Sequence, residues 1–512
     1  MKRNQFIILL CFIIVSFSIT TGVGCNSGRK KSKEVLRGEQ LAAQVCSSCH
    51  LPVSPDMLDK KTWTEHVLPA MAPHVGIQVW GQNQYFQDIK AGSKAVVSYG
   101  EWMAIVKYFE SEAPDSLLPA PLPVPYHEEG QPFVMKAPQW TDTTQVAGTT
   151  MVWIDTIRRY TWSADNTGRL FRWNAAMESK QVAQLRSPVV NILPAPDAID
   201  SSALILTLIG DMRATDLPQG EILKMQVSAD TAKPLQSMAL AMPRPLQTVP
   251  FDGNKDGLTD YIVCGFGHNA GGLYILQRHE EDEEFSRIDL REVPGATQVV
   301  TGDFNGDGWP DIMALFAHAQ EGIWMFLNDG KGGYNTKEIL QFPPVYGSTS
   351  FQLIDFNHDG RLDMLYTCGD NSDYSMVLKP YHGVYLFENK GDFKYEQAFF
   401  YPVNGCTKAV AADFDGDGDL DIVTIAFFSD LKNRPGEKLL YFEHQSQWRF
   451  VPYTLPGQRE GRWITMDVND IDGDGDPDVV LGNFSQGFMI QDGLTPYWNK
   501  FRPVCWLQNT TR

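Results

Sequence analysis

Positive charge and cysteine are both scarce in this sequence. It has 43 Lys and Arg residues against 62 Asp and Glu, which gives a formal net charge of −19. Binding to nucleic acid needs a basic face, so the composition argues against a nucleic-acid partner. The surplus of acid is either a solvated surface or a set of cation sites. The eight cysteines are too few and too scattered to form a disulfide scaffold. A length of 512 residues with 43% hydrophobic content predicts a globular protein of two or more units.

The N-terminus carries the pattern of an export signal. Lys2 and Arg3 precede an apolar stretch at residues 6–19, which predicts a signal peptide over residues 1–24. A transmembrane anchor is the alternative, but the stretch is short for a membrane span. Gly24 and Cys25 resemble the cleavage box of bacterial lipoproteins. The resemblance implies lipidation of Cys25, a tether at residues 25–32 and an exported protein anchored to a membrane of the bacterial envelope, facing either the periplasm or the cell surface.

A C-x-x-C-H motif is formed by Cys46, Cys49 and His50, and this pattern is typical of covalent c-type haem attachment. Two thiols one turn apart can reach the two vinyl groups of one haem, and the adjacent histidine then lies under the iron. A thioredoxin-like redox pair and half a zinc site are the alternatives. The motif lacks a βαβ context, and no further cysteine occurs before Cys264. The motif therefore predicts haem c as a cofactor.

The second axial ligand of such a haem is usually Met or His. The available residues are Met57, Met71, Met103, His66 and His74. Met71 lies between two prolines in a rigid segment and is the predicted ligand, with His74 and His66 as alternatives. Residues 33–113 resemble a small class I cytochrome c, which implies an all-α domain that transfers electrons. The proline-rich residues 114–131 predict an extended, semi-rigid linker before a second domain at 132–512.

Five acidic stretches share one internal spacing and begin at Asp252, Asp303, Asp355, Asp413 and Asp470. Each has Asp or Asn at positions 1, 3 and 5, Gly at position 6 and Asp at position 9. Alternating oxygens that converge around a sharp turn are typical of calcium loops. The predicted metal ligands are Asp252, Asn254, Asp256, Asp260, Asp303, Asn305, Asp307, Asp311, Asp355, Asn357, Asp359, Asp363, Asp413, Asp415, Asp417, Asp421, Asp470, Asp472, Asp474 and Asp478. Solvated turns are the alternative, which five copies at one spacing disfavour.

The stretches start 51 to 58 residues apart and are flanked by β-branched and aromatic segments. A period near this length with about four strands per repeat predicts a β-propeller. From about residue 130 the chain resembles the FG-GAP/VCBS-repeat family. Two degenerate copies, from residues 149 and 196, bring the predicted number of blades to seven, with six or eight as alternatives. The segment near Phe133 is expected to supply the outer strand that the last blade lacks. The predicted fold is thus multidomain, a small all-α domain followed by an all-β propeller.

The family resemblance implies that the acidic loops lie on one face of the propeller. Loops between the second and third strands of each blade then lie on the other face, and those at 369–383, 427–438 and 482–500 are long. Long loops on a scaffold are frequent binding sites, although loops that bond to one another are the alternative. The first of them carries Lys379, Tyr381 and His382. Cys368 and Cys406 are expected on this face, either paired or as free thiols.

The leading hypothesis is a mono-haem electron-transfer protein whose propeller docks a redox partner protein or an envelope electron carrier. One alternative is an oxidoreductase that binds a small-molecule substrate among the long loops and uses the haem as its electron outlet. Another is an adhesion module for a glycan or a protein. The sequence shows no nucleotide-binding fingerprint, no nucleophile motif and no assignable catalytic pair, and this favours electron transfer over catalysis.

Overall fold

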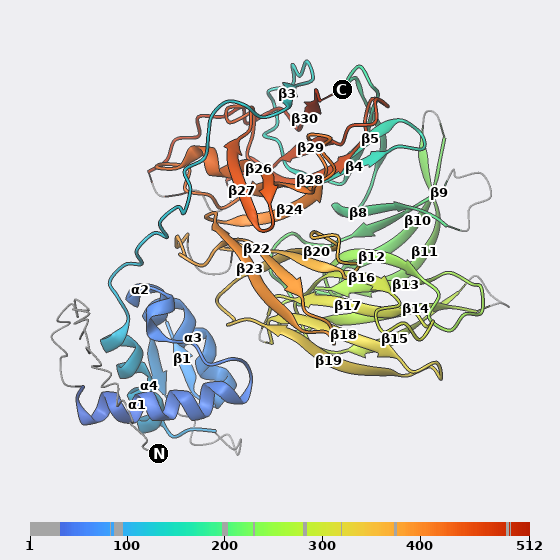
Figure 1. The fold of residues 1–512 in the computed structure, drawn as a ribbon. Coiled ribbons are helices and arrows are strands. Elements are labelled where there is room, and N and C mark those ends of the chain that lie inside the picture. The colour runs from blue at the N-terminus through green and yellow to red at the C-terminus, as the bar shows by residue number, and fades with distance from the viewer. Residues whose placement is uncertain are drawn as a thin grey trace, which may run out of the picture.

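The computed structural model describes residues 31–511 apart from 82, 87–95, 197–202, 229–230, 280–283, 319, 373–375, 488–490 and 492. The predicted signal peptide and Cys25 lie outside these residues. A helical module comes first and a β-propeller follows (Figure 1). Within the described part of the chain, no helix has both the length and the apolar character needed to cross a membrane.

The helical module is built around two longer helices. Its elements are α1 (Lys33–Val45), η1 (Cys46–Ser48), η2 (Pro55–Met57), α2 (Lys60–Thr62), η3 (Trp63–Val67), α3 (Leu68–Met71), η4 (Ala72–Val75), β1 (Gln78–Trp80), β2 (Gln84–Phe86) and α4 (Tyr99–Glu112). Ser32 caps α1, and Ser98 with Glu101 forms a capping box on α4, which satisfies amide groups that the first turns leave open.

α1 and α4 pack closely because of one glycine. A Cβ on Gly38 would lie 2.0 Å from the carbonyl oxygen of Ala104 in α4, so only glycine permits this approach. Trp102 and Phe109 of α4 are buried in the core of the module, where the Phe109 ring lies 4.4 Å from that of Trp63. Met103 lies within this helix.

The propeller has seven four-stranded antiparallel blades. Blade 1 comprises β4 (Thr149–Asp155), β5 (Tyr160–Asp165), β6 (Arg169–Trp173) and β7 (Ser179–Gln184), and blade 2 comprises β8 (Val189–Pro194), β9 (Ala203–Leu208), β10 (Gly220–Val227) and β11 (Ala232–Met242). Blade 3 comprises β12 (Pro245–Phe251), β13 (Asp260–Gly265), β14 (Gly272–Arg278) and β15 (Phe285–Arg291), and blade 4 comprises β16 (Ala296–Gly302), β17 (Asp311–Phe316), β18 (Gly322–Asn328) and β19 (Tyr334–Gln341). Blade 5 comprises β20 (Ser348–Ile354), β21 (Asp363–Cys368), β22 (Gly383–Asn389) and β23 (Tyr395–Pro402). Blade 6 comprises β24 (Cys406–Ala412), β25 (Asp421–Ala426), η5 (Pro435–Lys438), β26 (Leu439–Ser446) and β27 (Arg449–Thr454).

Blade 7 is made from two distant parts of the chain. β28 (Trp463–Asn469), β29 (Asp478–Asn483) and β30 (Val504–Asn509) are followed in the sheet by β3 (Phe133–Lys136). β3 pairs antiparallel with β30, with Phe133 opposite Asn509. The predicted closure by the segment near Phe133 is confirmed, as are the two degenerate blades and the total of seven.

Side chains on the innermost strands join all seven blades in a ring of hydrogen bonds. In each case a polar side chain bonds the backbone of the next innermost strand. Two side chains donate to a backbone carbonyl: Thr150 to that of Val189, and Lys408 to that of Met466. Five side chains accept from a backbone amide: Asn191 from that of Thr248, Gln247 from Val299, Gln298 from Phe351, Gln352 from Ala411, and Asp467 from Ile154. Because these groups are buried or half-buried, the ring satisfies backbone groups that face the central axis.

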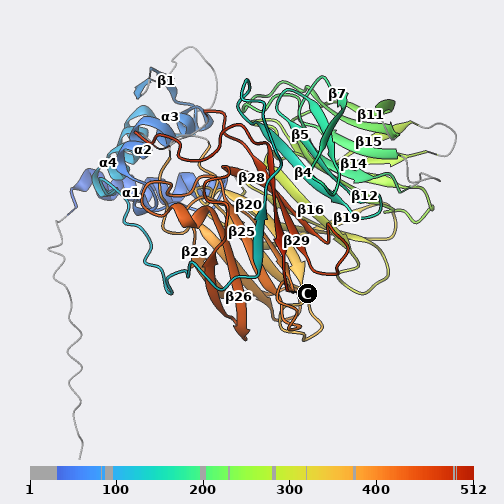
Figure 2. The ribbon, with the colours of Figure 1, turned by 90° about the horizontal axis from the view of Figure 1, so that it is seen from above.

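The linker after the helical module is fixed to the propeller. The Tyr401 hydroxyl donates to the carbonyl of Val124 at 2.7 Å, and the His127 amide donates to that of Pro452 at 2.8 Å. The predicted extended spacer is thus held against blades 5 and 6. Figures 1 and 2 show the helical module beside the propeller, on the side of blades 4 and 5.

Candidate functional site

The C-x-x-C-H motif begins where α1 ends. Cys46 starts the turn η1 and is half-buried, whereas Cys49 is exposed, and neither forms a disulfide within the described residues. Burial raises the pKa of the Cys46 thiol. His50 Nδ1 lies 2.7 Å from the carbonyl oxygen of Leu51; since a carbonyl only accepts, this nitrogen carries the proton and Nε2 is left as a metal ligand. Two free thiols one turn apart and an imidazole with its Nε2 available are the donor set that haem c requires.

Three methionines pack in the core of the helical module. Met71 is the last residue of α3, and Met57 and Met103 contact the same apolar cluster. His74 is exposed in η4. Packing places all three methionines at the same core, so it does not single out one of them, and Met71 stays a prediction.

The five acidic loops all join the first and second strands of their blades, and each begins just after the first strand ends. The carboxylate at position 1 accepts from the backbone amide of Gly at position 6, at 3.2 Å in the loop from Asp252 and at 2.8 Å in the loop from Asp303. In the last two loops, side-chain oxygens come within 4.8 Å of one another without an ion, those of Asp413, Asp415 and Asp417, and of Asp470, Asp472 and Asp478. This convergence suits a cation with oxygen ligands.

In the loop from Asp355, an arginine pairs with one of the loop carboxylates. Arg361, at position 7, forms an ion pair with Asp359 and donates to the carbonyl of Asn389 at 2.8 Å. The guanidinium therefore already offsets part of the negative charge in this loop, and it competes with a bound cation for the Asp359 carboxylate.

The aspartate at position 9 has a second role that the sequence pattern did not reveal. It is the first residue of the second strand in all five blades and is buried there; these residues are Asp260, Asp311, Asp363, Asp421 and Asp478. Asp311 accepts from the Phe304 amide in its loop at 3.0 Å and from the Asn328 amide of the third strand at 2.8 Å. The carboxylate thus ties the loop to two strands. The only hint in the sequence was its place directly before each buried strand.

Burial also disfavours the charged form of these carboxylates. It raises the pKa of Asp421 to about 7 and those of Asp260 and Asp478 to about 6, and neighbouring loop carboxylates add to the effect. A cation beside them would favour the charged form and lower these pKa values.

We expect substitutions at position 9 and at position 5 of a loop to change the free energy of unfolding by different amounts when no calcium is present. Asp311→Ala leaves two backbone amides unpaired in the blade, at about 1–3 kcal/mol each, so it should lower the free energy of unfolding in chelator by roughly 2–6 kcal/mol. Asp307→Ala, at an exposed position, should lower it by less than about 1 kcal/mol. Urea titration of both variants in chelator checks this. Equal losses would mean that Asp311 does not hold the strands together.

The long loops of the other face are used within the molecule. The Tyr381 hydroxyl donates to the Met57 carbonyl of the helical module at 3.0 Å, and its ring stacks on that of Tyr346 at 4.7 Å. Lys379 donates to the Val345 carbonyl at 3.0 Å, and His382 is buried. For these residues the alternative of mutually bonded loops holds, and no sequence pattern indicated that Tyr381 would bond the helical module.

Cys368 and Cys406 are buried free thiols. Cys368 packs in the apolar cluster between blades 4 and 5, whereas Cys406 packs in the cluster between blades 5 and 6. Their side chains lie on opposite sides of blade 5, which explains why they do not pair.

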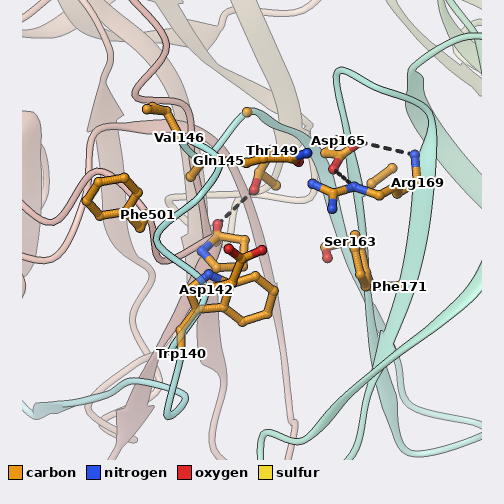
Figure 3. Close-up of a pocket in the computed structure, with 14 residues that line it drawn as sticks. Trp140, Asp142, Gln145, Val146, Thr149, Ser163, Asp165, Arg169, Phe171 and Phe501 are labelled. Carbon is orange, nitrogen blue, oxygen red and sulfur yellow. Dashed lines mark hydrogen bonds and ion pairs between the residues drawn. The ribbon is translucent and has the colours of Figure 1, made fainter.

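A cavity lies at the junction of blades 7 and 1 (Figure 3). Trp140, Phe171 and Phe501 line it, together with the Asp165–Arg169 ion pair of 2.6 Å. Its volume is about 20 Å³, room for roughly one water molecule, so a substrate does not fit.

Comparison with known proteins bears on the acidic blades. The family model described as FG-GAP-like repeat matches residues 252–314, 303–366 and 369–424. These segments are similar to FG-GAP-like repeats. They cover the first four acidic loops, and they lie within a seven-bladed propeller. Repeats in such a propeller suggest a binding module.

Two curated relatives match part of the chain. The T-cell immunomodulatory protein homolog of Plasmodium falciparum is 23% identical over 192 residues, which is 34% of this chain and 27% of that protein. Human cartilage acidic protein 1 is 24% identical over 252 residues, which is 45% of this chain and 36% of that protein. The chain therefore spans well under half the length of these relatives.

Solved structures resemble the chain only distantly. An ancestral GH74 enzyme has a TM-score of 0.45 at 10% identity, covering 71% of this chain and 48% of that one. The structure of U3-55K has a TM-score of 0.42 at 9% identity, covering 72% of this chain and 96% of that one.

Proposed function

We propose that the protein is a mono-haem c-type cytochrome, anchored to the bacterial envelope, that transfers electrons and uses its propeller to dock a redox partner. The observation that carries this proposal is the pair of free thiols, Cys46 and Cys49, just after α1, followed directly by His50, whose Nδ1 is bonded to the Leu51 carbonyl. When bound, the haem supplies one-electron chemistry. The chain supplies the attachment, the ligand and the position of the module.

The position of the helical module supports docking. The hydrogen bond from Tyr381 and the apolar contacts of Val345 and Tyr346 hold the module against blades 4 and 5. The linker is bonded along blades 5 and 6. A partner bound to the propeller would therefore meet the haem-binding segment in a set orientation, which shortens the search for a productive encounter.

The test is to mix oxidised protein with small-molecule reductants, with envelope extracts and with purified redox proteins, and to follow the haem spectrum. Reduction by a redox protein but by no small metabolite supports the carrier. Direct reduction by a metabolite would instead favour an oxidoreductase. Purified protein that carries no covalent haem would contradict the proposal that it is a c-type cytochrome.

We further propose that calcium occupies the acidic loops as a structural ion. Support comes from the repeated positions of their oxygens and from the two loops in which three side chains already converge. The ion would offset repulsion between carboxylates that lie close together. Its role is to hold the first two strands of each blade, not to take part in a reaction.

A second candidate function is a binding or adhesion module for a protein or a glycan. The FG-GAP-like repeats favour it. It leaves the C-x-x-C-H motif without a purpose, so a protein that binds a ligand and carries no haem is the result that would establish it.

The proposed lipid anchor at Cys25 leads to a separate prediction. Cys25→Ala should move the protein from the membrane fraction to the soluble fraction, because Cys25 is the only site proposed for lipid. Fractionation of cells followed by immunoblotting measures this, with Cys11→Ala as a control that keeps the lipidation site. Continued membrane association of the Cys25→Ala protein would contradict lipidation.

A further inference from the structure

The β1–β2 hairpin of the helical module presents an aromatic face to the outside. Val79 and Tyr85 pair across the hairpin and contact the core of the module. Since successive side chains of a strand point to opposite faces, Trp80 and Phe86 point away from that core, and they are 72% and 40% exposed. Trp80 is the only exposed one of the 13 tryptophans, all of which the structure describes. The two rings form an aromatic surface, and β1 lies at the edge of the molecule in Figure 2.

A third exposed apolar side chain lies at the base of the hairpin. Val96 is 65% exposed, and its amide donates to the carbonyl of Val75 at 3.1 Å, shortly before β1 begins. Single apolar side chains on a surface are ordinary, but several that gather in one place usually mark a contact with another apolar body. This end of the module is therefore a candidate contact surface.

The hairpin lies near the point where the proposed tether enters the module. The Tyr85 ring lies 5.6 Å from the ring of Trp102 in α4. Lys31, the first described residue, places its Nζ 5.5 Å from the ring centroid of Tyr108 in the same helix. Trp102 and Tyr108 are six residues apart in α4, which is about 9 Å along the helix axis. The hairpin and the end of the tether thus contact neighbouring turns of one helix.

The tether is also short. Six peptide units join Cys25 to Lys31, and they span about 22 Å at most when fully extended. A lipid on Cys25 would therefore keep this part of the module close to the membrane surface. Lys or Arg stands at positions 29, 30, 31 and 33, which suits contact with anionic headgroups.

We infer that Trp80 and Phe86 insert into the headgroup region of the membrane that holds the lipid on Cys25. This inference rests on the proposed lipid anchor. Amphipathic aromatic side chains are enriched at membrane–water interfaces, because the ring is apolar while the indole N–H can still bond to headgroups. The hairpin gives the module a second point of contact with the membrane. That contact sets the orientation of the module, which a flexible tether alone does not do.

Flotation with vesicles of phosphatidylethanolamine and phosphatidylglycerol tests this inference on the full-length Cys25→Ala protein, which has no lipid of its own. The protein should float with the vesicles, weakly enough to dissociate on dilution. Trp80→Gln combined with Phe86→Gln should weaken the binding by at least about tenfold, because two rings no longer leave water.

Leu118→Gln combined with Ile157→Gln is the matched control. It removes two apolar side chains that are 81% and 70% exposed, in the linker and in blade 1, and it should leave the binding unchanged. All four substituted positions are exposed, so the variants keep the fold, which circular dichroism checks. A hairpin variant that floats like its parent overturns the inference. If that variant also accepts electrons more slowly from a redox protein, the hairpin binds a protein and not a membrane.

Hydroxyl-radical footprinting of the lipidated protein in the same vesicles gives a second, residue-specific test. Oxidation of Trp80 and Phe86 should fall several-fold relative to the Cys25→Ala protein in solution, whereas oxidation of Ile157 should not change. Equal oxidation of Trp80 in both samples overturns the inference and leaves the lipid anchor intact. Absence of lipid on Cys25 by mass spectrometry overturns the anchor instead, and the flotation assay, which needs no lipid on the protein, still decides the role of the hairpin.

Discussion

Removal of calcium should lower the melting temperature of the propeller by roughly 10 °C, since each of five sites stabilises the native state by mass action. At a free calcium concentration 100-fold above the dissociation constant, each site adds about 2.7 kcal/mol, so five sites add on the order of 10 kcal/mol. Dissociation constants of order 10⁻⁴ M make calcium at about 10 mM a suitable concentration. Calorimetry with calcium and with chelator measures the shift.

The raised pKa values of three loop carboxylates predict how the stability of the calcium-free protein changes with pH. Asp421, Asp260 and Asp478 have folded-state pKa values raised by burial to about 7, 6 and 6. A raised pKa means that the folded state favours the protonated carboxyl, so this stability is present at low pH and is lost as the pH rises through about 6 to 7. The calcium-free protein should thus lose stability between about pH 4, the ordinary pKa of an aspartate, and about pH 7. The calcium-loaded protein should lose much less.

Two controls accompany the chelation experiment. Magnesium at the same concentration should restore less of the melting temperature, because it demands a more rigid octahedral set of ligands. Arg361→Ala should increase the shift, because it frees the Asp359 carboxylate from its ion pair. Protein that contains no calcium by elemental analysis and melts identically in chelator would contradict the metal assignment.

Met71→Ala should abolish the weak far-red sulfur-to-iron band of the oxidised protein and lower its reduction potential, because a thioether ligand favours ferrous iron. The ultraviolet–visible spectrum and a potentiometric titration measure the two effects. Wild-type protein should be low-spin with His50 and Met71 as axial ligands.

Substitutions elsewhere in the module separate ligation from packing. Met103→Leu should keep the band and change the free energy of unfolding by less than about 1.5 kcal/mol, because the side-chain volume is conserved. Cys46→Ala combined with Cys49→Ala should remove covalent haem whichever residue lies opposite His50. If Met71→Ala leaves the spectrum unchanged, Met71 is not the ligand, and His74→Ala is the next variant.

The repeat pattern predicted the propeller because the same acidic loop occurs five times in the sequence. The acidic loops marked the turn between the first two strands of blades 3 to 7, and their spacing of 51 to 58 residues indicated about four strands per blade. Blades 1 and 2 were found from strand spacing alone. The Phe133 segment could be placed only because the last blade was one strand short.

The remaining features depend on contacts between residues that are distant in the chain. Asp311 looked like a ligand because its spacing fits one, yet its bond to the Asn328 amide requires knowledge of the third strand. Tyr381 was predicted to be a possible ligand-binding residue. Its contact with the helical module, more than 300 residues earlier in the chain, has no pattern in the sequence. The bonds between innermost strands are made by isolated Gln, Asn, Thr, Lys and Asp residues, which form no motif in the sequence.

The composition of blade 7 sets an order of assembly. β3 precedes six complete blades in the chain and β30 follows them, so the ring cannot close until all the intervening blades have been made. Contacts between such distant segments form late, because the chain between them must first be brought together. A chain that crosses a membrane with its N-terminus first therefore presents the Cys46–His50 segment while its partner blades are still open. Maturation of the helical module can be completed during this interval, before Tyr381 and the closed ring fix it in place.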